Sequence, residues 1–228
     1  MSRGHGFSLI ELLIVVVLLA IIASIAIPNL MASRMTANEA AAIATMRTIM
    51  SAQGLFRSQK AMDDDADSVG EYGYMGELSG SVPLNLRANG NGSALPLKPA
   101  VLDGLFQLIS AGRVGSTGYL FEIFLPDAGG AGVGEAPAGG PTGAEGADWC
   151  EDYWAVYAYP VKTGTLGNRA FCANERGEIR QTRMDVMQYG FSARPSWDAA
   201  YQTVNGTMAD PLGTGATAVD GNIWVTVQ

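Results

Sequence analysis

Apolar residues fill positions 9–27 almost without interruption, and only Glu11 and Ser24 break the run. A helix over residues 12–33 is about 33 Å long at about 1.5 Å per residue, which matches a bilayer hydrocarbon core of about 30 Å. The pattern therefore predicts a membrane-spanning helix whose membrane half covers about residues 7–33. Pro28 lacks the N–H of a helical hydrogen bond, so we expect a kink or a locally melted stretch at residues 24–28.

Beyond Pro28 the apolar residues change to helical spacing, with arginines and a lysine on the other faces. The apolar positions are Ile43, Met46, Ile49, Met50 and Phe56. A stripe of this kind is typical of a helix that packs against the rest of a domain. The sequence therefore predicts one continuous helix over residues 7–61.

Residues 62–228 have the mixed pattern of a globular head. Several aspartates after position 62 end the helix, and the leucines of residues 101–111 predict a short amphipathic helix capped by Gly112. Strand-forming segments then follow at residues 119–125, 153–159, 169–173 and 178–182. The predicted fold class is α+β: a long N-terminal helix packed on a small antiparallel β-sheet head.

Two segments of the head differ from this strand-and-turn pattern. Residues 127–147 are dominated by Gly, Ala and Pro, which predicts a mobile loop. The tail, residues 184–228, carries apolar and aromatic residues that predict packing on the head, with an added strand at residues 222–227. These residues are Trp197, Tyr201, Ile223, Trp224 and Val225.

Glu11 is the one carboxylate in the apolar run. A carboxylate at the hydrocarbon centre costs about 2.5–3.5 kcal/mol on insertion scales, so its presence indicates a function and a partner. In a helix, Phe7 and Glu11 lie one turn apart on the same face. The residues before Phe7 form a short segment that ends at Gly6, and a cut after this segment would leave the apolar helix in the mature chain.

The segment Gly6-Phe7-Ser8-Leu9-Ile10-Glu11-Leu12-Leu13 resembles the prepilin signature of type IV pilins and type II secretion pseudopilins. The resemblance implies that residues 1–6 are a leader peptide, and that a prepilin peptidase cuts between Gly6 and Phe7 and methylates the new amine of Phe7. It also implies that Glu11 neutralises the Phe7 amine of a neighbouring subunit during filament assembly. Pro28 falls where the family usually has a proline in the assembly helix.

The resemblance also implies partners and a location. The partners are identical or homologous pilin subunits, the prepilin peptidase, an inner-membrane assembly platform, and membrane lipid before assembly. Arg3 on the leader predicts a cytoplasmic N-terminus by the positive-inside rule. The chain is therefore expected as a single-pass protein of the bacterial inner membrane, and then in a periplasmic or extracellular filament.

Composition excludes several other classes of protein. The chain has 14 Lys and Arg against 22 Asp and Glu, a net charge of −8, so we expect no general nucleic-acid binding. The single histidine, His5, lies in the leader, so the mature chain would hold no Ser-His-Asp centre and no histidine-ligated metal. Cys150 and Cys172 are expected to form one disulfide in an outward-facing head, with two separate buried thiols as the alternative.

Three further motifs resemble binding sites only in part. We therefore expect no cofactor and no metal. Asp63, Asp65 and Asp67 alternate as in calcium loops, but Ser68 and Tyr74 stand where such a loop needs Gly and Glu, which favours a solvated acidic turn. The glycines of residues 130–134 precede no helix that could complete a phosphate-binding loop. The aromatic residues of the head are expected in the core or an interface rather than in a sugar-binding surface.

The sequence therefore predicts a structural subunit, not an enzyme, that polymerises through its N-terminal helix into a type IV pilus or a type II secretion pseudopilus. One alternative is a minor pilin or adhesin whose head binds a surface, DNA or a glycan. The other is a membrane-tethered enzyme, which no constellation of residues supports. The choice between pilus and pseudopilus is left open by the sequence.

Overall fold

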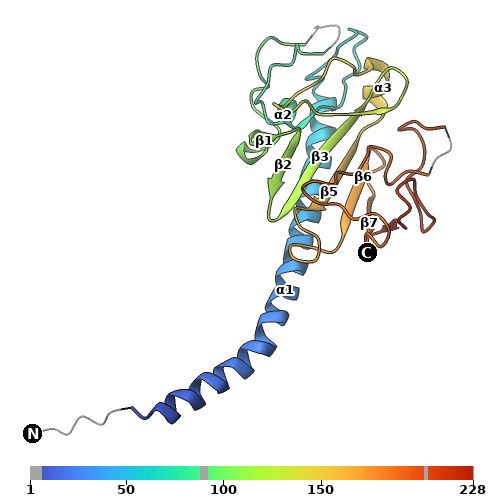
Figure 1. Ribbon diagram of the computed structural model, residues 1–228. Helices are drawn as coiled ribbons and strands as arrows, with labels where there is room; N and C mark the ends of the chain where they lie inside the picture. Colours follow the sequence, from blue (N-terminus) through green and yellow to red (C-terminus); the bar gives the residue numbers. More distant parts are fainter. Residues whose placement is uncertain (1–6, 88–91, 203–204, 228) are drawn as a thin grey trace, which may run out of the picture.

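The computed structural model describes residues 7–87, 92–202 and 205–227. One helix, α1 (Leu9–Ser58), dominates it: its first half extends away from the molecule and its second half enters a β-rich head (Figure 1). This is the expected α+β arrangement of a long apolar helix and an antiparallel sheet. The predicted leader, residues 1–6 with Gly6, lies outside the described residues.

The helix α1 continues through Pro28 without interruption, so the melted stretch predicted at residues 24–28 is not present. Proline removes one helical hydrogen bond, the one to the carbonyl of Ser24, while the bonds on either side remain. Strong helix formers such as Leu and Ala flank the site. The helix accommodates Pro28 by curving along its length rather than by breaking (Figure 1).

The head is built on one antiparallel sheet with the strand order β1-β2-β3-β5-β6-β7-β8, and β4 pairs with the end of β3. The elements after α1 are α2 (Met75–Leu78), the 3₁₀ turn η1 (Gly104–Gln107), β1 (Ile109–Ser110), β2 (Arg113–Ser116), β3 (Tyr119–Pro126), β4 (Gly132–Gly134), α3 (Ala147–Asp152), β5 (Ala155–Pro160), β6 (Ala170–Asn174), β7 (Ile179–Thr182) and β8 (Val225–Thr226). The strands β3, β5, β6 and β7 form the predicted meander, and β8 lies in the predicted tail strand. The sequence analysis missed β1, β2 and β4.

Both faces of the sheet are buried, which makes three layers. Alternate residues of β6 show the division: Phe171 and Ala173 join the core beneath α1, whereas Ala170 and Cys172 join a second core beneath the C-terminal segment. The C-terminal segment therefore covers the sheet face opposite α1, as the predicted packing of the tail requires. Trp224 and Tyr201 are buried in this second core, but Ile223 and Val225 remain exposed.

The helix predicted at residues 101–111 is wrong. Only η1 is helical there, and β1 follows it directly. Asp103 accepts a hydrogen bond from the N–H of Leu105, which starts a single turn. Ala111 and Gly112 then take positive φ angles of 55° and 73°, the geometry of a two-residue hairpin turn between β1 and β2. Gly112 is thus a hairpin residue and not a helix cap.

The Gly-rich segment, residues 127–147, is packed against the head, contrary to the predicted mobile loop. Its residues 132–134 form β4, and the side chain of Trp197 lies so close to Gly132 that an added Cβ would approach it to 2.5 Å. Carboxylates within the segment replace the missing apolar side chains: Asp127 Oδ1 accepts hydrogen bonds from the N–H groups of Gly129 and Ala131 at 2.8 and 3.0 Å. The composition predicted a mobile loop because composition does not show these hydrogen bonds between carboxylates and backbone N–H groups.

Polar contacts fix α1 on the head at both ends of its packed half. Near the membrane half, Glu39 accepts hydrogen bonds from the N–H of Asn168 at 2.9 Å and from Arg169 Nε at 2.7 Å. Near the distal end, Gln53 donates to the carbonyl of Gly73 at 2.7 Å and accepts from its N–H at 3.0 Å. Both contacts are directional, so they set the depth at which the helix enters the head.

Gln53→Leu is expected to destabilise the head by about 2–4 kcal/mol, because the buried N–H and C=O of Gly73 each lose their partner at about 1–3 kcal/mol. The matched control is Ser51→Ala on the exposed face of α1, where we expect a change within about 0.5 kcal/mol. Chemical denaturation of the detergent-solubilised chain, followed by tryptophan fluorescence, measures both. Equal stability of the two variants would contradict the role assigned to Gln53.

Candidate functional site

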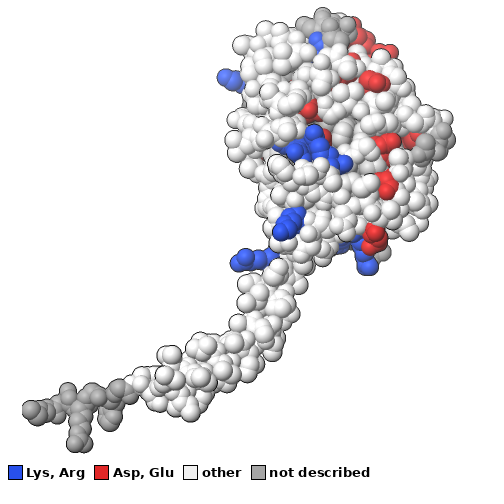
Figure 2. Space-filling model, in the orientation of Figure 1, with Lys and Arg blue, Asp and Glu red and all other residues white. Residues whose placement is uncertain are grey.

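The membrane half of α1 is an apolar surface that no described part of the chain covers. The most apolar 18-residue window of α1 has a mean hydropathy of 3.1, and none of it is buried in the head. The large side chains exposed on this half include Leu12, Leu13, Ile14, Val15, Val16, Val17, Leu18, Leu19, Ile21, Ile22, Ile25 and Ile27. The face seen in Figure 2 shows no charged side chain along this half, whereas the head carries charges of both signs. A surface of this size and composition requires lipid or protein around it.

Two hydroxyls of this half are satisfied within the helix. The hydroxyl of Ser24 donates to the carbonyl of Ile21 at 2.7 Å, and that of Ser33 donates to the carbonyl of Asn29 at 3.0 Å. Hydrogen bonds of this kind let a hydroxyl enter an apolar environment without an external partner. The segment is therefore suited to a bilayer or to a dry protein interface.

Glu11 has no such partner within the helix. It lies in the first turn of α1, where its carboxylate is exposed and has no hydrogen bond or ion pair with another described residue. Phe7, one turn earlier, is 73% exposed at the same end of the helix. The carbonyl of Ser8 accepts the first hydrogen bonds, from the N–H groups of Glu11 and Leu12 at 3.1 and 3.2 Å. The remaining first-turn N–H groups make this end of the helix electropositive, so a carboxylate is favoured at this end.

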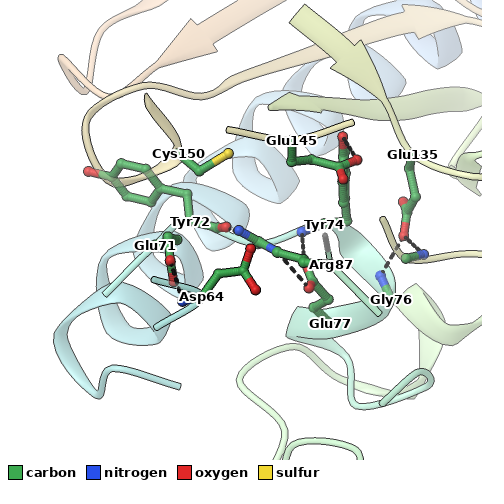
Figure 3. Close-up of polar contacts among 12 residues, drawn as sticks. Asp64, Glu71, Tyr72, Tyr74, Gly76, Glu77, Arg87, Glu135, Glu145 and Cys150 are labelled. Carbon is green, nitrogen blue, oxygen red and sulfur yellow. Dashed lines mark hydrogen bonds and ion pairs between the residues drawn. The ribbon is translucent and has the colours of Figure 1, made fainter. Parts of the chain in front are cut away.

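A second cluster of polar residues lies buried in the head around α2 (Figure 3). The guanidinium of Arg87 donates to both carboxylate oxygens of Glu77, at 3.1 and 2.9 Å, and also to the carbonyl of Tyr72. Burial opposes the charge on Arg87, but the adjacent Glu77 outweighs it and raises the pKa of the guanidinium. This ion pair connects α2 to a residue ten positions further along the chain, which is a structural function.

Two carboxylates of the Gly-rich segment join this cluster with opposite pKa shifts. Glu135 Oε1 accepts from the N–H groups of Gly76 and Gly140 at 2.7 and 2.8 Å, yet burial raises the pKa of Glu135 to about 7. Burial alone would also raise the pKa of Glu145. Donors on Thr142 and other loop N–H groups, together with the hydroxyl of Tyr74, outweigh burial and lower that pKa.

The predicted disulfide between Cys150 and Cys172 is not formed, and both thiols are free and buried. Cys150 lies in α3 and belongs to the core beneath α1, whereas Cys172 in β6 points into the core beneath the C-terminal segment. The sheet separates them, so the alternative of two buried thiols holds. Burial raises the pKa of Cys150 to about 12, which makes it a poor nucleophile.

Two groups of exposed and half-buried carboxylates in the described chain, which share Asp65, have the spacing of a cation site. One oxygen from each of Asp63, Asp65 and Asp67 lies within 4.8 Å of the others, and Asp65 forms a similar group with Asp148 and Glu151 of α3. Desolvation and then the charges of Asp67 and Asp65 raise the pKa of Glu151 to about 7. The aspartates also accept backbone hydrogen bonds from Asp67, Ser68 and Val69, as in an acidic turn.

The sequence predicts roles for Phe7, Glu11 and Pro28 but gives no sign of the buried cluster. Glu77 and Arg87 stand in a region without periodicity, and Glu135 and Glu145 stand in low-complexity sequence. Single charged residues in such surroundings are usually solvated, so no sequence signal marked these as buried. The structure brings them together because Arg87, Glu135 and Glu145 each contact α2 or Tyr74, the residue before it.

Glu135→Gln is expected to change the pH dependence of stability. The pKa of Glu135 is raised from 4.5 to about 7 in the folded head, so its stabilising contribution is complete below about pH 4.5 and is lost as the pH rises through 7. Between pH 4 and pH 8, the free energy of unfolding of the variant should therefore rise by up to about 3 kcal/mol relative to that of the wild type.

Glu145→Gln is the matched control, with the opposite sign. The pKa of Glu145 is lowered on folding, so its contribution is present above about pH 4.5 and falls as the pH drops below that value. Denaturation curves of the two variants between about pH 2 and pH 8 should therefore differ from the wild type with opposite signs, that of Glu145→Gln below about pH 4.5 and that of Glu135→Gln between about pH 4.5 and pH 7. Curves parallel to the wild type over this whole range would contradict the assigned shifts.

Comparison with known proteins connects these features to a family. Residues 1–27 match the family described as the prokaryotic N-terminal methylation motif. The type II secretion system core protein G of Vibrio cholerae is 28% identical over 149 residues, which are 65% of this chain and 94% of that protein. The type IV major pilin protein of Myxococcus xanthus is 37% identical over 75 residues, a third of each chain.

A further relative, the type IV wide pilus major component of Thermus thermophilus, is 40% identical over 57 residues, which are 25% of this chain and 44% of that protein. The comparison with solved structures gave no match. The motif covers the apolar run with Phe7 and Glu11, and the similarity to the Vibrio protein extends over almost all of that protein. In this motif and in these relatives, the chain is similar to type IV pilins and type II secretion pseudopilins.

Proposed function

We propose that the chain is a structural subunit of a type IV pilus or type II secretion pseudopilus, and that it polymerises through the membrane half of α1. The observation that carries the proposal is this uncovered apolar helix with one unpaired carboxylate, Glu11, within the methylation motif. The relatives support it, because they are named as major pilins, a pilus component and a secretion core protein. The role is structural rather than catalytic.

The proposed route begins in the membrane. The leader is cut between Gly6 and Phe7 by a prepilin peptidase, and the new Phe7 amine is methylated. The chain then stays in the inner membrane as a single-pass protein with a cytoplasmic N-terminus, until the assembly platform extracts it. The satisfied hydroxyls of Ser24 and Ser33 support a stay in lipid.

In the filament, the apolar helices pack against those of neighbouring subunits. Burial of this surface supplies about 25 cal/mol per Å², a term that has no direction and so cannot fix the axial position of a subunit. Glu11 supplies the direction by pairing with the Phe7 amine of a neighbour. Any other axial position leaves two buried charges uncompensated, at a cost of several kcal/mol. Pro28 belongs to the same helix, and its lost hydrogen bond marks where α1 would bend on assembly.

Glu11→Ala is expected to leave membrane insertion unchanged and to lower filament incorporation by at least about tenfold, because an unpaired buried charge costs about 3–5 kcal/mol. Ser24→Ala is the control, since this polar group of the same helix is satisfied internally and assembly should be unchanged. Immunoblots of the membrane fraction and of the sheared filament fraction measure both steps. Normal filaments from Glu11→Ala would refute the assigned role.

The processing step predicts the mass of the mature chain. Intact-mass and N-terminal peptide analysis of assembled protein should find a chain that begins at Phe7 and carries one additional methyl group on its amine. Retention of residues 1–6 in the filament would rule out the pairing, because the amine of Phe7 would then be part of a peptide bond.

A further inference from the structure

The two edges of the sheet carry different apolar surfaces, and neither is covered by the described part of the chain. In the strand order, β1 lies at one end and β8 at the other, so each pairs with one neighbour only. The labels of β1 and β7, which neighbours β8, stand on opposite sides of the head in Figure 1. Each edge therefore offers a surface to another molecule.

The β1 edge presents two leucines that project from the surface. Leu105 lies in η1 and Leu108 directly precedes β1, and they are 42% and 72% exposed. Their backbone is fixed, because Asp103 caps the turn and Phe106 between them is buried in the core. These side chains form a small apolar projection on a rigid support, which we name the leucine knob.

The β8 edge has a groove. Its volume is about 450 Å³, and it is lined by Arg169, Gln181, Thr182, Arg183, Asp185, Ile223 and Val225. Ile223 and Val225 are 56% and 42% exposed, although the residue between them, Trp224, is buried. The tail therefore anchors this edge through Trp224 and presents the apolar side chains on either side to the groove.

The groove continues toward the assembly helix. Arg169, Arg183 and Asp185 also line a larger hollow of about 710 Å³ that reaches Ala32, Met35 and Thr36 of α1. A molecule seated in the edge groove is therefore next to the end of the helix half that packs in the filament. The head surface and the helix surface form one continuous face.

We propose that the leucine knob of one subunit docks into the edge groove of the next copy in the filament. The two surfaces differ, so their contact is heterologous, and a heterologous contact that does not close into a ring builds an open helical assembly. A second copy is the occupant that fits, since one chain carries both the projection and the hollow, and the groove adjoins the packing helix. This inference rests on the proposed function, because it names the contact between heads within that filament.

Disulfide cross-linking in assembled filaments tests the contact. The variant that combines Leu108→Cys and Ile223→Cys should give a ladder of dimers, trimers and longer chains after mild oxidation, because each copy is linked to two neighbours. The native Cys150 and Cys172 are buried and should not contribute. Each single variant should remain monomeric, and so should Leu108→Cys with Thr214→Cys, an exposed position that lines a different hollow.

Two results would overturn the proposal: filaments of the double variant without a ladder, or a dimer from either single variant, which would indicate contact between like surfaces. A charge exchange gives an independent measurement. Leu108→Asp and Ile223→Arg should each lower filament yield several-fold at an unchanged membrane level, and their combination should restore it. Failure of restoration would also overturn the contact. Absence of filaments from the wild-type chain would instead refute the proposed function.

Discussion

The structure depends on how α1 is divided: one half of the helix is covered by the head, and the other half is covered by none of the residues that the structure describes. The covered half is fixed by apolar packing and by directional contacts at Glu39 and Gln53. The uncovered half can be stable only in lipid or against other helices. A single continuous helix joins the two environments, so a movement of the exposed half is transmitted directly to the position of the head.

Apolar burial and charge pairing have separate functions in this arrangement. Burial supplies most of the favourable free energy but tolerates sliding, because it depends on area and not on direction. In the proposed filament, Glu11 provides the charge whose pairing is sensitive to an axial step. The same division of functions recurs in the head, where apolar cores hold the layers while the Glu77–Arg87 pair and the carboxylates of residues 127–147 hold the loops in place.

The C-terminal segment changes the surface that a second copy of the chain would contact. It covers the sheet face opposite α1 and buries Trp224 and Tyr201, so the sheet has no free face in the described chain. If α1 lies toward the filament axis, this layer lies on the outside. It also places Ile223 and Val225 at the sheet edge, where the proposed contact with the leucine knob forms.

The sequence by itself determined the long helix, the position of Glu11 behind Phe7 and the central meander, because each depends on a local period or on a short motif. It did not determine the β1–β2 hairpin or the pairing of β4, since Gly112 and Gly132 there lie against Glu135 and Trp197, which are distant in the chain. The expected disulfide was wrong for the same reason: spacing cannot tell which face of a sheet a cysteine occupies. Burial of Glu77, Arg87 and Glu135 was likewise decided by tertiary packing, because a charged residue is stable inside only where the fold brings donors and acceptors to it.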